Sequence, residues 1–375
     1  MVFMGEVSKK INNLNELGFN PFFESKVNEA DSGHFSPARV IAEHKGAYKV
    51  KNINGEFLAK ITGKRRFEAT SREDYPAVGD WVLISETDNE QVVIKSILPR
   101  QTIIKRRFGD KNKYGEKGDV QIIASNIDVG FVVESVDRDY NLNRFERYLT
   151  ILKDSEVKGT IILNKIDLLS DKEREVKLSE LKDRFPNIDI IMVSTVSSDG
   201  LNKLKNYVEK GKTYCFLGSS GVGKSSLINK LIGEELIITS DVGFYSDRGK
   251  HTTTRRQMYF LDNGGIVIDN PGIREVGIVD AGEGVDIFFE EITALGQKCK
   301  YIDCTHTHEP GCVVISAVKS GQIDGEKYTN YVNLKKEAEY NDMSASQKRQ
   351  KSKNFGKFVN KAKKDLKDFG HENYQ

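Results

Sequence analysis

A glycine-rich stretch in the middle of the chain constrains the fold more than any other feature. It reads GSSGVGKSS over residues 218–226 and matches the pattern G-x-x-x-x-G-K-[ST]. An apolar segment, TYCFLG, precedes it, and a helix-like segment, GKSSLINKLIG, follows. Glycines let backbone N–H groups curl around a phosphate at a helix N-terminus, where the helix dipole favours negative charge. The stretch therefore predicts a strand, a phosphate-binding loop and a helix within an α/β domain.

Each position of this phosphate loop has an expected role. Lys224 would neutralise the β- and γ-phosphates of a nucleotide and take part in catalysis, and Ser225 would bind Mg²⁺. The other loop residues expected to contact the phosphates are Gly218, Ser219, Ser220, Gly221, Val222, Gly223 and Ser226.

The chain around the loop alternates between strand-like and helix-like segments. The strand-like ones are NIDVGFVVES, GTIILNKID, IDIIMVST and TYCFLG, and the helix-like ones between them are NLNRFERYLTILKDS, KEREVKLSELKDRF and GLNKLKNYVEK. Such alternation predicts a parallel sheet covered by helices. Ligands of these sheets bind at the carboxyl ends of the strands, where the phosphate loop lies.

A second motif, NKID at residues 164–167, ends one of these strands. Asp167 would accept hydrogen bonds from the ring N–H and the exocyclic amine of guanine, which adenine does not present in that arrangement. Lys165 would lay its stem over the base, and Asn164 would brace the phosphate loop. Ser194 and Thr195, at the next strand end, would contact the guanine oxygen through backbone N–H groups. The motif predicts GTP or GDP; the alternative is an ATPase with a chance NKID.

Two stretches after the phosphate loop fit the parts that sense a γ-phosphate. In GGIVIDNPGI, Asp269 ends a strand and would hold Mg²⁺, while the N–H of Gly272 would bind the γ-phosphate. In DVGFYSDRGKHTTTRRQ, Thr253, or failing that Thr252, would complete the Mg²⁺ shell only when the γ-phosphate is present. The alternatives are a plain turn at the first stretch and a threonine-rich segment without a ligand at the second.

Composition limits the remaining possibilities. The 375 residues are enough for two or three domains, and no apolar run approaches the roughly 20 residues that span a bilayer. The first residues lack the pattern of a secretory leader, so we expect a cytoplasmic protein without membrane contact. The chain has four cysteines, too few for a disulfide framework, and Cys215 is expected in the core.

The other three cysteines crowd one segment, CKYIDCTHTHEPGC. Cys299, Cys304 and Cys312 with His306 make three thiolates and one imidazole, a ligand set typical of structural Zn²⁺. His308 is a rival for the histidine position. Reduced thiols without a metal are the other interpretation of the cluster.

Residues 36–110 follow a different pattern, with short alternating segments separated by turns such as NING and AVGD. They predict a small β-barrel of SH3 or OB type. Two KRRF stretches, at residues 64–67 and 105–108, combine cations with an aromatic ring, as RNA-binding OB-folds do. Residues 348–364 form a second basic segment without an acidic residue until Asp365. The alternative interpretation of either basic set is an ordinary solvated surface that does not bind RNA.

The motifs occur along the chain in an unusual order, with the base motif before the phosphate loop and the two switch stretches last. Circular permutation explains this order, because it leaves the parts together in space. With PAVGDWV and ILPR in the barrel, NKID, GSSGVGKSSLIN, GKHTTT, DNPGI and the Cys/His cluster, the sequence resembles the RsgA (YjeQ) family of circularly permuted GTPases along nearly its whole length.

The resemblance implies an N-terminal OB-type β-barrel, a circularly permuted Ras-like α/β P-loop GTPase domain and a C-terminal, mainly helical zinc-binding domain. The expected bounds are an extension at 1–35, the barrel at 36–110, the GTPase domain at 111–285, and the zinc domain with its basic tail at 286–375. The implied protein is a monomer that docks on the 30S ribosomal subunit and its 16S rRNA and couples GTP hydrolysis to late maturation and release. The family pattern C-x4-C-x-H-x5-C favours His306 as the zinc ligand.

Catalysis requires a group that aligns the attacking water. Ile273 occupies the position where Ras-like GTPases often have a glutamine, and its side chain cannot hydrogen-bond a water. We expect slow intrinsic hydrolysis and assign the alignment to His251, with contact to ribosomal RNA as its alternative role. The switches adjoin the zinc domain in sequence, so γ-phosphate sensing is expected to pass to that domain. A GTP-gated rRNA-binding protein with incidental hydrolysis is the alternative function.

Overall fold

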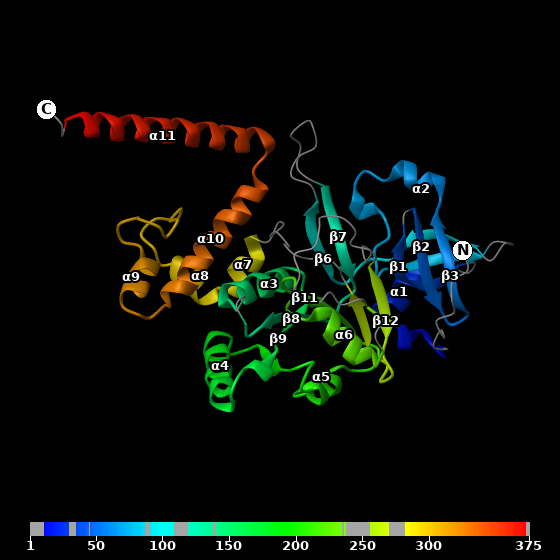
Figure 1. Cartoon of the computed structure of the whole chain (residues 1–375). Helices are drawn as coiled ribbons and strands as arrows, with labels where there is room; N and C mark the ends of the chain where they lie inside the picture. The colour runs from blue at the N-terminus through cyan, green and yellow to red at the C-terminus, as the bar shows by residue number, and fades with distance from the viewer. Residues whose placement is uncertain are drawn as a thin grey trace.

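The computed structural model describes residues 11–29, 35–44, 46–86, 91–108, 119–137, 140–234, 236–237, 256–269 and 282–372. A β-barrel lies at one end, a helical region at the other and an α/β domain between them (Figure 1). A long last helix extends from the helical region away from the rest of the molecule (Figure 1). The predicted fold class is confirmed.

The α/β domain is built on a parallel sheet with the order β10-β9-β8-β11-β13, followed by the antiparallel strand β12. The strands are β8 (Val129–Ser135), β9 (Lys158–Asn164), β10 (Asp189–Met192), β11 (Thr213–Leu217), β12 (Gln257–Phe260) and β13 (Ile266–Asp269). The helices between them are α3 (Leu142–Asp154), α4 (Asp171–Arg184), α5 (Leu201–Tyr207) and α6 (Lys224–Ile232). All seven segments predicted around the phosphate loop form the expected strand or helix.

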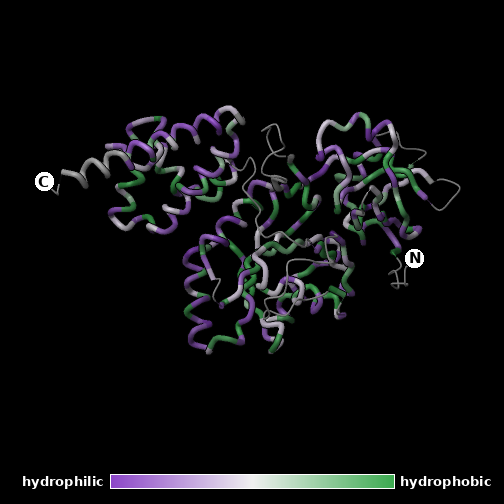
Figure 2. The backbone as a smooth tube through the Cα atoms, turned by 45° about the horizontal axis from the view of Figure 1, so that its top comes forward, coloured by the Kyte–Doolittle hydropathy of each residue, from purple (hydrophilic) through white to green (hydrophobic). Residues whose placement is uncertain are grey.

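Successive residues of the central strands point to opposite faces of the sheet, as strand geometry requires. On β8, Phe131 and Val133 pack in a core with residues of α5 and α6, whereas Val132 packs in a core with residues of α3 and α4. Hydrophobic segments follow the central strands and hydrophilic ones the outer helices (Figure 2). Cys215 of β11 is fully buried, as expected. Both faces of the sheet are therefore covered, which leaves its carboxyl edge for a ligand.

The barrel has five strands in the cyclic order β1-β2-β3-β5-β4, closed by pairing of β1 with β4. The strands are β1 (Ser36–His44), β2 (Ala47–Asn52), β3 (Gly55–Ile61), β4 (Trp81–Glu86) and β5 (Gln91–Ile97); α2 (Gly63–Glu68) and the 3₁₀ turn η2 (Arg72–Asp74) connect β3 to β4. Closure removes the free sheet edges that an open five-stranded sheet would expose. This is the small barrel that the alternating segments predict.

The barrel and the α/β domain share one sheet. Strand β12 pairs with β1 at Gln257 and Ala42, and a hairpin of β6 (Ile103–Phe108) and β7 (Asp119–Ser125) lies between the two domains. The buried Arg39 guanidinium joins the parts by donating to the carbonyls of Leu17, Gly79 and Asn126. The expected domain boundary after residue 110 falls between the paired strands β6 and β7, and the domain bounds stay predictions.

The N-terminal segment, expected as an extension, packs on the barrel. It contains the 3₁₀ turn η1 (Leu14–Leu17) and the helix α1 (Pro21–Glu29). Leu17 and Phe23 are buried together with Trp81, and the Phe19 ring meets the Trp81 ring edge-on at 4.8 Å between centroids. These residues pack on the barrel because their apolar side chains are matched by barrel residues more than 50 positions away.

Replacing Phe23 by alanine is expected to destabilise this docking by about 3 kcal/mol, because it leaves a cavity beside a buried ring. Trp81 is the one tryptophan of the chain, and its ring centroid lies 5.9 Å from that of Phe23, so tryptophan fluorescence during urea unfolding reports on the site directly. The matched control is Phe67→Ala on α2, whose side chain is 92% exposed. Equal midpoints for the two variants would contradict the prediction.

The C-terminal region is helical, as expected. It contains α7 (Gly282–Phe288), α8 (Glu290–Gly296), α9 (Val313–Lys319), α10 (Gly325–Asp342) and α11 (Ala345–Glu372). Helices α7 and α10 pack on α3, and Val285, Phe289 and Tyr331 belong to the same hydrophobic core as β8 and β9. Among the described residues, no helix is long and apolar enough to cross a membrane.

Candidate nucleotide site and metal centre

The phosphate loop connects the end of β11 to the start of α6, at the carboxyl edge of the sheet. Gly218 (φ 146°) and Gly223 (φ 94°) have backbone conformations that favour glycine. A Cβ at Gly218 would lie 2.1 Å from the carbonyl oxygen of Val133, and one at Gly223 would lie 2.2 Å from Nδ2 of Asn164. Both glycines of the motif are thus required by close packing as well as by backbone conformation.

The polar side chains expected to meet the phosphates and Mg²⁺ lie around this loop. The Lys224 ammonium donates to the carbonyl oxygens of Gly218 and Ser219 at 2.7 and 2.5 Å, which holds it across the loop. Ser225 is in the first turn of α6. Asp269 ends β13 and is 8% exposed; because Ile268 is in register with Cys215, the end of β13 lies beside the end of β11 that leads into the loop. Hydroxyl and carboxylate oxygens are ligands that Mg²⁺ prefers.

The base motif contacts the phosphate loop directly. The buried Asn164 amide donates to the carbonyl oxygen of Val222 at 2.8 Å, which is the bracing contact expected from the sequence. The Asp167 carboxylate accepts a hydrogen bond from the Ser194 hydroxyl. That hydroxyl also accepts from the N–H of Val196 at 3.1 Å, so it shapes the loop after β10. The structure thus brings together motifs that lie 51 residues apart.

The remaining residues of the base motif also lie at this edge. Lys165 has a left-handed backbone (φ 63°), and its ammonium pairs with the Asp137 carboxylate at 2.7 Å. Asp137 in turn accepts from the Ser135 hydroxyl at the end of β8. Thr195 is half-buried next to Ser194. The Asp137 contact was not predicted, since a carboxylate in a loop carries no signal in the sequence.

Arg144, near the start of α3, is a further residue that the sequence analysis missed. Its guanidinium donates to the Ser219 hydroxyl of the phosphate loop at 3.0 Å and to the buried Glu134 carboxylate at 3.2 Å. A single arginine on an amphipathic helix is usually a surface residue, so nothing in the sequence singled it out. His251, Thr252, Thr253 and Gly272 lie outside the described residues.

The cysteine cluster lies between α8 and α9. The ligand atoms of Cys299, Cys304, His306 and Cys312 are all within 4.8 Å of one another. The Sγ atoms of Cys299 and Cys312 are 3.8 Å apart, and His306 Nδ1 is 3.6 and 3.5 Å from them. Ligands held at about 2.0–2.3 Å from one ion in a tetrahedron lie roughly 3.3–3.8 Å apart. Three of the four ligand atoms therefore have the spacing that Zn²⁺ requires, and the Sγ atom of Cys304 lies within 4.8 Å of them.

The surroundings favour the protonation state that a metal requires at two of the ligands, whereas burial and the neighbouring thiols raise the pKa of Cys304 to about 11. Burial lowers the pKa of His306, which keeps its imidazole neutral near pH 7. Burial acts to raise the pKa of Cys299, but hydrogen bonds from the N–H groups of Val313 and Val314 outweigh it and the pKa lies below its usual range. The rival His308 is exposed, and its Nδ1 pairs with the Thr307 hydroxyl at 2.8 Å.

Comparison with known proteins places the chain among its relatives. Residues 97–279 match the family model described as RsgA GTPase. The chain is 35% identical over 368 residues to the Small ribosomal subunit biogenesis GTPase RsgA 1 of Bacteroides thetaiotaomicron, covering 97% of this chain and 100% of that protein. The chain belongs to the RsgA GTPase family. RsgA 2 of Lactiplantibacillus plantarum is 41% identical over 82% of this chain and 85% of its own.

Solved structures agree with membership of the RsgA GTPase family. YjeQ from Thermotoga maritima has a TM-score of 0.60 at 26% identity, covering 81% of this chain and 98% of its own. YloQ, described as a circularly permuted GTPase, has a TM-score of 0.58 at 22% identity over 82% of this chain and 96% of its own, and it supports the fold. As a member of the RsgA GTPase family the protein hydrolyses GTP, and the ATPase alternative is set aside.

Proposed function

We propose that this RsgA-family GTPase binds the 30S ribosomal subunit and its 16S rRNA, assists late maturation of the subunit, and is released after ribosome-stimulated hydrolysis of GTP to GDP and phosphate. The observation that carries the proposal is its identity of 33–41% over most of its length to proteins named small ribosomal subunit biogenesis GTPases. The two KRRF stretches and the basic α11 supply cations for RNA phosphates. We further propose that it acts as a monomer in the cytoplasm.

Different residues of the chain would bind the base and the phosphates at the nucleotide site. Asp167 accepts from the guanine edge, with its carboxylate held by Ser194, and Lys165 covers the base. The phosphate loop wraps the phosphates, with Lys224 neutralising charge that develops in the transition state. Ser225, Asp269 and Thr253 would hold Mg²⁺, which would supply further neutralisation of the phosphate oxygens.

His251 is the residue to which we assign alignment of the water. The Ile273 position cannot hydrogen-bond water, so a neutral imidazole next to the threonines of GKHTTT is the candidate in this chain. The γ-phosphate is then sensed by Thr253, with Thr252 as the second candidate, and by the N–H of Gly272.

The cysteine cluster would hold one structural Zn²⁺. Cys299, Cys304, His306 and Cys312 fill all four positions of a tetrahedral ion, which leaves no position for a substrate. Cys312 also caps α9, because its sulfur accepts a hydrogen bond from the N–H of Ile315. We propose that the metal fixes the loop between α8 and α9 and, through it, the RNA-facing shape of the C-terminal region.

Helix α3 offers a path from the nucleotide to this region. Arg144 contacts the phosphate loop, and one turn later Arg147 pairs with Glu337 of α10 through two hydrogen bonds of 2.8 and 2.6 Å. Between them the buried Glu146 accepts from Asn330 of α10 and from Arg184 of α4. We propose that this helix, in addition to the segment after Gly272, carries γ-phosphate sensing to the zinc domain.

The test of the proposal is GTP turnover with and without purified 30S subunits. Strong stimulation is expected for the unaltered protein, and His251→Ala is expected to lower the stimulated kcat about 100-fold with little change in GDP affinity. His308→Ala, which replaces an exposed imidazole, is the matched control. Stimulated turnover that is unchanged in His251→Ala would overturn the catalytic assignment. Binding to 30S subunits without any stimulation would favour a GTP-gated rRNA-binding protein.

A further inference from the structure

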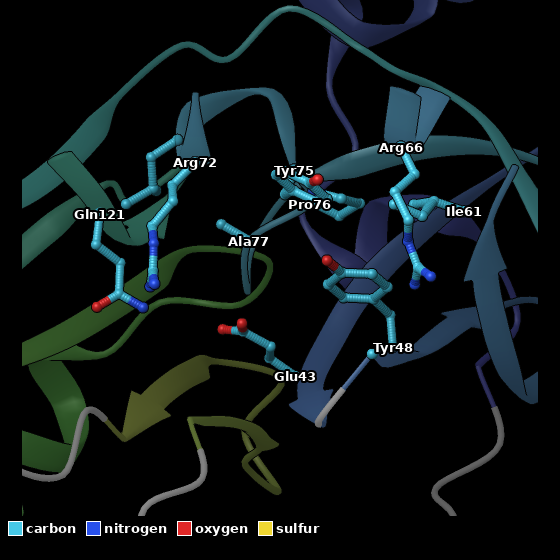
Figure 3. A pocket seen from close by; sticks show the side chains of 11 residues that line it. Glu43, Tyr48, Ile61, Arg66, Arg72, Tyr75, Pro76, Ala77 and Gln121 are labelled. Atoms are coloured by element: carbon cyan, nitrogen blue, oxygen red, sulfur yellow. The ribbon is translucent and has the colours of Figure 1, made fainter. Parts of the chain in front are cut away.

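A pocket separate from the phosphate loop opens between the barrel and the hairpin β6–β7. It has a volume of about 400 Å³, and its walls come from β1, β2, β3, α2, η2 and β7. Figure 3 shows Arg72 and Gln121 on one side and Arg66 on the other, with the ring of Tyr48 between them. A pocket of this size accepts a ligand as large as a nucleoside. We call it the barrel pocket.

The lining combines flat apolar surface with charge. Ile61, Pro76 and Ala77 supply the apolar part, and the half-buried Tyr75 supplies an aromatic ring, while Tyr48 packs in the barrel core and is 6% exposed. Aromatic rings on an OB-type barrel stack on nucleobases, whatever the base, because every base has a π-face. The apolar and aromatic part of the barrel pocket therefore suits a planar ring.

The cations at the rim suit a phosphate. The guanidinium groups of Arg66 and Arg72 lie at opposite sides of the pocket (Figure 3). Within the described part of the chain, Arg66 forms no ion pair. Its positive charge acts electrostatically on the Tyr48 hydroxyl and slightly opposes the rise of its pKa. Burial is the main cause that raises the pKa of Tyr48, so this hydroxyl stays protonated and can donate. A guanidinium fork matches two oxygens of a phosphate.

We propose that the barrel pocket binds a nucleoside phosphate, with its base against Tyr75 and its phosphate at Arg66. Glu43 and Gln121, on the pocket wall, face the edge of the base. A free nucleotide and an unstacked nucleotide of single-stranded RNA both present this chemistry. The site is additional to the GTP site at the phosphate loop and does not depend on the identity of the ribosomal partner.

A ligand in the barrel pocket would affect the GTPase domain, because the pocket adjoins a residue next to β12. The Glu43 carboxylate lies 3.5 Å from the guanidinium of Arg256, which also donates to the carbonyl oxygen of Ile122 at 3.0 Å. Glu43 and Ile122 line the pocket, while Arg256 directly precedes β12 of the GTPase sheet. A base that hydrogen-bonds Glu43 competes with Arg256 for the same carboxylate.

The experiment uses the full chain with excess GDP, so that the phosphate-loop site is filled. One arm titrates each of the four nucleoside 5′-monophosphates by calorimetry, and the other titrates a fluorescent ten-nucleotide single-stranded RNA by anisotropy. Arg66→Ala is expected to weaken binding about fivefold, through loss of a phosphate contact, and Tyr75→Leu about tenfold, through loss of stacking. Circular dichroism melting verifies that each variant is folded.

Lys64→Ala is the matched control, because it removes one cation from the same helix α2 at a side chain that is 83% exposed and does not line the pocket. Weakening by Arg66→Ala but not by Lys64→Ala supports the proposal; monophosphate binding identifies a free nucleotide, and RNA binding alone identifies a strand. Equal effects of the two substitutions, or no binding in either arm, would overturn it.

Discussion

Replacing Asp167 by asparagine is expected to change the nucleotide preference from GTP to xanthosine triphosphate. A carboxylate accepts from both the N1–H and the 2-amino group of guanine, whereas an amide offers one acceptor and one donor. Xanthine carries a carbonyl oxygen where guanine carries the amine, so it matches the amide. Because Ser194 holds the side chain at this position, the swap keeps the geometry and changes only the hydrogen-bond pattern. We expect kcat/KM for GTP to fall about 10³-fold, since a buried donor loses its acceptor.

The measurement is kcat/KM of the two proteins for GTP, ATP and xanthosine triphosphate. Asp171→Asn makes the same chemical change four residues later, at a side chain that is fully exposed on α4, and should leave all three values unchanged. If Asp167→Asn hydrolyses GTP as well as the unaltered protein does, Asp167 does not read the base. The assignment of the whole NKID motif would then have to be abandoned.

Replacing His306 by alanine is expected to release the zinc ion, whereas His308→Ala should retain it. Structural Zn²⁺ sites of four ligands bind with about 10–16 kcal/mol, so one ligand is worth roughly 3 kcal/mol, or about 100-fold in affinity. The imidazole of His306 lies against two thiols, while that of His308 points to Thr307 on the exposed side of the loop. The two substitutions are chemically identical and two positions apart, which isolates the effect of metal binding.

Metal content after dialysis against a weak chelator, measured by mass spectrometry, decides between the two histidines. We also expect His306→Ala to lower the melting temperature of the C-terminal region, because Cys312 caps α9 and its sulfur belongs to the cluster. Zinc retained by His306→Ala and lost by His308→Ala would reverse the ligand assignment. Absence of zinc from the unaltered protein would indicate a cluster of reduced thiols.

The parts of the site that could be predicted from the sequence are those formed by residues that lie close together along the chain. The phosphate loop could be recognised because Gly218 and Gly223 permit backbone conformations that few other residues adopt, and a strand and a helix must flank them. The same holds for NKID, where Lys165 takes a left-handed conformation directly after a buried strand. Alternation of strands and helices then placed both motifs at one edge of the sheet.

The parts that were missed depend on contacts between distant segments. The burial of Leu17 and Phe23 is decided by Trp81, which the composition of the first 35 residues does not reveal. Arg144 and Asp137 are polar residues in ordinary positions, and only the folded chain shows what they contact. The two histidines of the cysteine cluster differ through backbone conformation, since His306 has a φ of 59° and turns its ring inward.

If helix α3 carries the coupling proposed above, that coupling acts in both directions. Arg144 and Arg147 are three residues apart and so project from the same side of the helix, one to the phosphate loop and the other to α10. A coupling free energy between two sites is the same whichever ligand binds first. If bound GTP raises the affinity of the C-terminal region for RNA tenfold, bound RNA raises the affinity for GTP tenfold. The ribosomal particle would then control how long the nucleotide stays bound.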